Sequence, residues 1–152
     1  MADYYLQFSE TLDALNPEEE KWLHEQLAVD PHTDCPTFLL DYEDRDPDDP
    51  DYGFERSFQG EGDERHLWVH ADDHGDVDRL AHLVKKFLTA FRPGECWSLN
   101  YANTCSKPRV DGFGGGAVFV TVDEIRSHSS GEYIYQQRQA FEAAKAKPAL
   151  PR

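Results

Sequence analysis

The change from strand pattern to helix pattern is clearest in residues 66–91, which read HLWVHADDHGDVDRLAHLVKKFLTAF. Leu67 and Val69 alternate with polar or aromatic side chains, as in a strand with one buried face. From Asp76 onward the apolar residues recur at helical spacing instead, and Asp76 is itself a good N-cap. Pro93 and its neighbours end the pattern. These residues therefore predict a strand followed by an amphipathic helix.

The segments before this strand and helix show the same two patterns, alternation typical of a strand and helical spacing of apolar residues. Residues 4–9 alternate as a half-buried strand, and Asn16 followed by Pro17 begins a helix that Pro31 ends. Residues 37–42, TFLLDY, are predicted to form a short second strand. Residues 54–59 are expected to pair with the strand at 66–71, in a hairpin closed by residues 60–64.

The segments after the amphipathic helix predict two more strands and a weaker helix. Residues 96–102 alternate, and residues 117–122 are the most strand-like run, with a Gly-rich loop over 103–116 between them. Thr121 and Glu124 are spaced as a capping box for a short helix. The apolar and long side chains Ile134, Arg138 and Phe141 are spaced as a final helix.

This order of strands and helices predicts the fold class. Strands interrupted by two good helices favour an α+β two-layer sandwich, with a mainly antiparallel sheet, two principal helices and a weaker C-terminal helix. A chain of 152 residues is expected to form a single domain, here residues 1–147, followed by a short tail over 148–152.

The composition narrows the class of partner. The chain has 30 Asp and Glu against 15 Lys and Arg, a formal net charge of −15. This charge argues against direct binding to nucleic acid or to anionic membranes, since both repel a negative surface. Three cysteines do not make a disulfide framework, and no signal peptide or membrane-spanning run is recognised. We therefore expect a cytoplasmic protein without a cofactor.

The most acidic segment is residues 41–55, in which eight carboxylates are opposed only by Arg45. Such a run cannot enter a core, because each buried charge would need a partner. Asp44, Asp46 and Asp48, with Glu55, partly match a calcium loop, but Asp49 stands where that loop needs glycine. The alternatives are a solvated loop and a surface for a basic partner. The candidate partner-binding residues are Asp41, Glu43, Asp44, Asp46, Asp48, Asp49, Asp51, Tyr52 and Glu55.

The function predicted from this segment is that of a non-enzymatic acidic interaction module. Proteins that hold DNA line their clefts with Lys and Arg, so a folded chain with spaced carboxylates can occupy such a cleft. By analogy with inhibitors of restriction and CRISPR complexes, the partner would be a nucleic-acid-binding protein. Tyr42, Tyr52 and Phe54 would supply apolar anchors beside the charges. An enzymatic activity is left open but is not favoured.

The alternative site is the Gly-rich segment over residues 104–117. Successive backbone N–H groups in such a loop can cradle an anion, and cations beside a cysteine raise its reactivity. Against this, no phosphate-loop motif is present, and a tight connection between two strands explains the glycines equally well. The candidate ligand-binding residues are Cys105, Lys107, Arg109, Gly114, Gly115 and Gly116.

Histidines are also numerous, and the densest group is His66, His70 and His74 together with Asp72 and Asp73. On a strand, His66 and His70 share a face but lie roughly 13 Å apart. This distance argues against joint ligation, and no metal site is predicted.

Residues 97–121, WSLNYANTCSKPRVDGFGGGAVFVT, resemble a segment of small uncharacterised bacterial, phage and plasmid-borne proteins. The similar proteins also begin with a Tyr-Tyr-x-Gln-Phe-like strand and carry a Leu-Trp-Val-His-like strand before a helix. No activity is assigned to that group, so the resemblance implies none. A mobile-element setting would favour an inhibitor or accessory protein over a metabolic enzyme.

Overall fold

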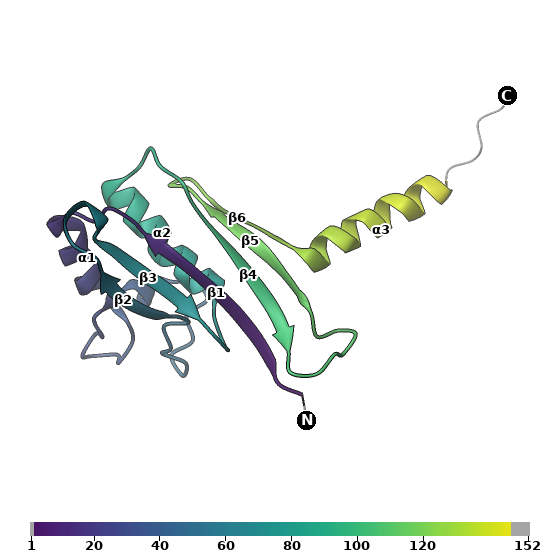
Figure 1. The fold of residues 1–152 in the computed structure, drawn as a ribbon, viewed down its shortest axis with the longest axis horizontal. Helices are drawn as coiled ribbons and strands as arrows, with labels where there is room; N and C mark the ends of the chain where they lie inside the picture. The colour runs from purple at the N-terminus through teal and green to yellow at the C-terminus, as the bar shows by residue number, and fades with distance from the viewer. Residues whose placement is uncertain (1, 147–152) are drawn as a thin grey trace.

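Six antiparallel strands form one sheet in the order β2-β3-β1-β4-β5-β6, and two helices cover one of its faces (Figure 1). The computed structural model describes residues 2–146, so the predicted tail over 148–152 lies outside the described residues. The elements are β1 (Tyr4–Leu12), α1 (Pro17–Leu27), η1 (Thr37–Leu39), β2 (Glu55–Gln59), η2 (Gly62–Glu64), β3 (His66–Ala71), α2 (Val77–Phe91), β4 (Trp97–Cys105), β5 (Gly114–Val120), β6 (Ile125–Ser129) and α3 (Ser130–Ala146), where η marks a short 3-10 helix.

The core lies between the sheet and the helices α1 and α2. Phe8 of β1 pairs in register with Ala71 of β3 and with Tyr101 of β4, and its side chain is 6% exposed. On β3, Leu67 and Val69 are fully buried, as their alternation predicts. The α+β class with a mainly antiparallel sheet and two principal helices is therefore confirmed.

Local sequence explains how both packed helices begin. The predicted capping box of α1 is present, because Asn16 Oδ1 accepts from the Glu19 amide at 2.8 Å and Glu19 Oε1 accepts from the Asn16 amide at 2.9 Å. In α2, Asp76 accepts from the amides of Asp78 and Arg79. The helices then pack through Trp22 and Phe87, whose ring centroids lie 6.1 Å apart.

The predicted strand over residues 37–42 is wrong, since Thr37–Leu39 form the 3-10 helix η1 and a turn follows it. The amide of Thr37 donates to the carbonyl of Ala28, which turns the chain back against α1 instead of into the sheet. Phe38 and Leu39, which are consecutive, are both buried. A strand would point them to opposite faces, so a tight helical turn suits this burial better.

Two further predictions need correction near the C-terminal edge of the sheet. The predicted short helix at Thr121 is wrong, because the amide of Thr121 donates to the carbonyl of Glu124 at 3.0 Å and closes a turn into strand β6. The loop predicted over 103–116 is shorter than expected, since β4 continues to Cys105 and β5 begins at Gly114. Both strands are longer than their alternation indicated because pairing with a neighbour, rather than burial, sustains them.

The final helix is confirmed, but it does not join the helical layer. In Figure 1, α3 leaves the end of β6 and projects away from the sheet. No residue of α3 is buried.

Candidate functional site

Both candidate segments lie at the same end of the sheet, drawn toward the bottom of Figure 1. Because neighbouring strands are antiparallel, the starts of β1, β2 and β5 meet the ends of β3, β4 and β6 there. The acidic loop, residues 41–54, leads into β2, and the Gly-rich loop, residues 106–113, joins β4 to β5. Segments about 60 residues apart in sequence are thereby brought to one surface.

The acidic loop is held against α2 by ion pairs. Near its start, Asp41 lies 3.1 Å from Lys86 Nζ and 2.9 Å from His82 Nε2. Further along, the Arg79 guanidinium lies 3.3 Å from the Asp49 carboxylate and donates to the carbonyl of Asp51. Arg79 is 7% exposed, so its charge lies beneath the loop rather than on the surface. The loop is thus an ordered feature of the fold.

The aromatic residues of the acidic loop face the interior. The Tyr52 hydroxyl donates to the carbonyl of Leu27 at 2.6 Å, and the Arg56 guanidinium lies 3.4 Å from the centre of its ring. Phe54 is 6% exposed and packs near Phe38. These two aromatic side chains therefore anchor the loop to the core, which is a different role from the partner contact that the sequence suggested.

Carboxylates from the connection between β3 and α2, residues 72–76, join those of the loop. Asp51, Glu55, Asp72 and Asp73 line one small hollow of about 160 Å³. The Asp76 amide donates to the carbonyl of Gly53 at 2.8 Å, which ties this connection to the acidic loop. Gly53 has φ +84°, and a Cβ there would lie 2.7 Å from the Cβ of Asp76, so the close approach requires glycine.

The carboxylates of the acidic loop and of residues 72–78 alter the pKa values of their neighbours. Partial burial raises the pKa of the Asp78 carboxyl, and the negative charges of Asp76 and Asp44 raise it further. Burial likewise raises the pKa of Tyr42, followed by the charges of Asp76, Asp78 and Asp44. Asp44 from the loop and Asp78 from α2 are therefore parts of one negative surface.

We call this surface the acidic end. It comprises ten carboxylates, those of Asp44, Asp46, Asp48, Asp49, Asp51, Glu55, Asp72, Asp73, Asp76 and Asp78. Of the other predicted residues, Glu43 is exposed beside it, and Asp41 is engaged by α2. Sequence reasoning missed Asp72, Asp73, Asp76 and Asp78 as members. The run DDHGDVD, residues 72–78, was the available signal, but its proximity to residues 44–55 depends on pairing in the sheet.

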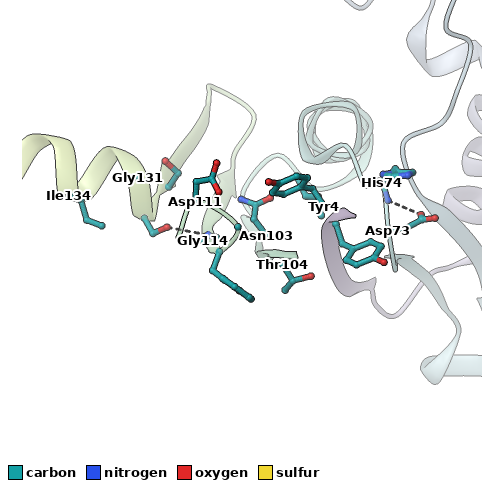
Figure 2. A pocket seen from close by; sticks show the side chains of 17 residues that line it. Tyr4, Asp73, His74, Asn103, Thr104, Asp111, Gly114, Gly131 and Ile134 are labelled. Carbon is teal, nitrogen blue, oxygen red and sulfur yellow. Dashed lines mark hydrogen bonds between the residues drawn. The ribbon is translucent and has the colours of Figure 1, made fainter. Parts of the chain in front are cut away.

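A larger hollow, of about 670 Å³, lies on the Gly-rich side of the same end. In Figure 2, Gly131 and Ile134 lie on one side of it, and Asp73 and His74 lie on the other. Its lining includes Gly114 and Gly115, as well as Tyr4 and Asn103. Two carboxylates, those of Asp73 and Asp111, face it, so its charge does not suit an anion.

The other residues of the predicted ligand site lie outside this lining. Lys107 and Arg109 are exposed on the loop, and Cys105 is half-buried behind it. A Cβ on Gly112 would lie 2.6 Å from the Cβ of Cys105, so the loop packs closely over this cysteine. Gly116 packs inside the sheet, where a Cβ would lie 2.5 Å from the His128 carbonyl oxygen. The structure thus separates the cations of the loop from its glycines.

Within residues 2–146, no three side chains of His, Cys, Asp or Glu are grouped so that they could hold a metal ion. His74 lies at the end of β3 in the lining of the larger hollow, while the His70 ring stacks on Trp68 at 3.8 Å. No described helix is both long and apolar enough to cross a membrane.

Comparison of the chain with protein-family models, with curated proteins and with solved structures finds no match. The resemblance of residues 97–121 to mobile-element proteins therefore stays a prediction.

Proposed function

We propose that the chain is a non-enzymatic interaction protein whose acidic end binds a basic protein surface. The observation that supports this most directly is the gathering of ten carboxylates from two separate segments on one ordered surface. Burial is the main cause of the raised pKa of Asp78, and the charges of Asp76 and Asp44 raise it further, so these three carboxylates disfavour one another in the free protein. A cationic partner would relieve that repulsion on binding.

Order in the acidic loop supports tight and specific binding. Arg79 and Asp41 fix the loop against α2, and Tyr52 fixes it to the core. A surface that is already ordered loses less conformational freedom when a partner docks. A concentrated negative patch also accelerates the encounter with a basic partner, in a manner that salt suppresses.

The partner class that we propose is a nucleic-acid-binding protein. Its binding cleft carries the density of Lys and Arg that ten carboxylates can match. The chain would then act as an inhibitor that occupies the cleft in place of a polyanion. The broader form of the same proposal is that the partner has a basic surface, whether or not that surface binds nucleic acid.

The test is capture of partners from host lysate by the tagged protein, at about 0.1 M and about 0.5 M salt, because screening weakens exposed charge pairs across this range. We expect a basic protein that is retained at low salt and displaced by added DNA. The triple variant Asp44→Lys, Asp46→Lys, Asp48→Lys should no longer retain this basic protein. The matched control is Asp13→Lys, Glu25→Lys, Asp123→Lys, which changes the net charge equally at exposed positions outside the acidic end. Equal retention by both variants would contradict the proposal.

The larger hollow supports a second candidate function, binding of a small neutral or cationic molecule. Its volume of about 670 Å³ falls within the range of ligand pockets, and Asn103, Thr104 and Asp111 offer hydrogen-bonding groups. A metabolite panel should then contain a compound that raises the melting temperature, with the rise lost in Asn103→Ala, Asp111→Ala. The control is Lys107→Ala, Arg109→Ala, outside the lining. Loss of the rise in the control instead would indicate an anion at the loop.

A further inference from the structure

The helix α3 stands apart from the rest of the described chain. It spans 17 residues, Ser130–Ala146, and none of them is buried. Figure 1 shows it extending away from the sheet after β6. Its described contacts with the domain are at its first turn, where the Ser130 hydroxyl accepts from the Gly115 amide at 3.2 Å.

A helix in this position needs a surface to pack against. Isolated helices of about 15 residues are marginal in water, because most helical stability in proteins comes from packing of an apolar face. In α3 the side chains of Tyr133, Ile134 and Phe141 are 54%, 55% and 65% exposed. With Ala140 and Ala144 they follow helical spacing along one side of the helix. We call these five residues the α3 stripe.

Net charge distinguishes the C-terminal arm, which we define as residues 125–146 of β6 and α3, from the rest of the protein. Residues 125–146 carry three cationic and two acidic side chains, a net charge of +1, whereas the whole chain carries −15. A basic partner that is drawn to the acidic end gains nothing from this arm. Two copies of the chain repel each other over most of their surfaces, and they meet with least repulsion here.

We propose that a second copy of this chain covers the α3 stripe, so that two α3 helices pair antiparallel about a twofold axis. The pairing is self-complementary, as a twofold interface requires. An antiparallel arrangement centred between residues 137 and 138 sets Ile134 of one copy beside Phe141 of the other. The polar Gln137 then lies close to the axis.

The expected dimer is weak, and it leaves the acidic loop free. Each α3 is roughly 25 Å long, so the pair buries on the order of 1,000 Å², at the low end for specific interfaces. We therefore expect dissociation in the micromolar range. The acidic loop, residues 41–54, lies on the other side of the domain from α3 in Figure 1, whereas Asp73 of the acidic end lines the same hollow as Ile134 of the α3 stripe.

The first experiment is sedimentation equilibrium of the whole chain from about 1 µM to about 200 µM, a range that brackets micromolar dissociation. We expect a concentration-dependent monomer–dimer equilibrium. Ile134→Glu, Phe141→Glu should shift the dissociation constant upward by at least about tenfold, since two carboxylates would enter an apolar contact. The control is Val29→Glu, Val110→Glu, which adds the same charge at exposed apolar positions outside α3.

The second experiment tests the geometry of the pairing. In a Cys96→Ser, Cys105→Ser background, Gln137→Cys should form an intermolecular disulfide under mild oxidation, because residue 137 lies near the proposed axis. Gln139→Cys is the matched control, since it lies about 200° further round the same helix. A wild type that stays monomeric to about 200 µM would overturn the proposal. Equal dimerisation by Ile134→Glu, Phe141→Glu, or equal crosslinking at both cysteines, would also overturn it.

Discussion

Arg79 of α2 lies beneath the acidic loop, with its guanidinium 3.3 Å from the carboxylate of Asp49, 30 residues earlier in the chain. The same guanidinium donates to the carbonyl of Asp51 and lies 3.3 Å from Asp76. One buried cation thereby holds two carboxylates and one backbone carbonyl in a fixed arrangement. Because Arg79 is buried and paired with Asp49 and Asp76, its positive charge does not reach the surface. The surface above it therefore remains negative.

Replacement of Arg79 should release the acidic loop. Arg79→Ala removes the ion pair with Asp49 and leaves the Asp51 carbonyl without its donor, so we expect a loss of about 2 kcal/mol in the free energy of unfolding. Limited proteolysis should cut residues 41–54 faster in this variant. The control is Arg126→Ala, whose ion pair with Glu124 is exposed and should matter little. Unchanged proteolysis in Arg79→Ala would show that Asp41 and Tyr52 hold the loop without it.

The ion pair between the buried Glu19 and the half-buried Arg92 should make stability depend on pH. Burial acts to raise the pKa of Glu19, but the hydrogen bonds and charge of Arg92, with the Asn16 amide, outweigh it and lower the pKa below 4.5. The pair therefore stabilises the fold above the unfolded pKa of about 4.5, and this contribution is lost as the pH falls through the lower folded value.

Glu19→Gln should accordingly lower the free energy of unfolding by about 3 kcal/mol at pH 7, because Arg92 loses a buried partner. The difference from the wild type should shrink as the pH falls below the folded pKa of Glu19. Urea unfolding of the variant and the wild type, at pH 7 and at a pH below the folded pKa of Glu19, measures the difference in the free energy of unfolding. Glu95→Gln is the control, since Glu95 lies 3.6 Å from Arg92 but is 61% exposed. A difference that does not change with pH would show that packing, rather than charge, explains the loss.

Asp44 should raise the pKa of Asp78 across the acidic end. Burial and Asp76 contribute to the raised pKa of Asp78 as well, so Asp44→Asn should lower this pKa without restoring its ordinary value. Because a raised folded pKa means that the charged form destabilises the fold, Asp44→Asn should add stability at neutral pH, by less than about 0.5 kcal/mol. This gain should vanish as the pH falls through the pKa of Asp78. Carboxyl titration by NMR measures the shift, and an unchanged Asp78 titration would refute the coupling.

The glycine run of β5 should be sensitive to a single methyl group. A Cβ on Gly116 would lie 2.5 Å from the His128 carbonyl oxygen and 2.7 Å from the Tyr101 hydroxyl. Gly116→Ala should therefore cost about 1–3 kcal/mol through overpacking. Gly94→Ala has open space around it and is the matched control, with little expected change in melting temperature. Equal melting temperatures for the two variants would mean that β6 moves aside without cost.

Local chemistry was enough to predict the packed helices and most strands. The cap at Asn16 and the helical spacing after Asp76 act within a few residues, so they can be read along the chain. The hairpin of β2 and β3 was equally local, since only six residues separate its strands. The acidity of residues 41–55 also determined that this segment lies on the surface, because unpaired carboxylates do not enter a core.

Tertiary structure alone decided where these pieces meet. Residues 37–42 lost the expected strand because Thr37 bonds to Ala28, and β6 formed because β5 offered an edge beyond the turn at Thr121. Antiparallel pairing brought Asp72 and Asp73 beside the acidic loop, and it separated Lys107 and Arg109 from the hollow. Such placements depend on hydrogen bonds and packing between residues distant in sequence, which no local pattern encodes. The composition therefore determined the negative charge of the surface, while the fold determined its concentration at one end of the sheet.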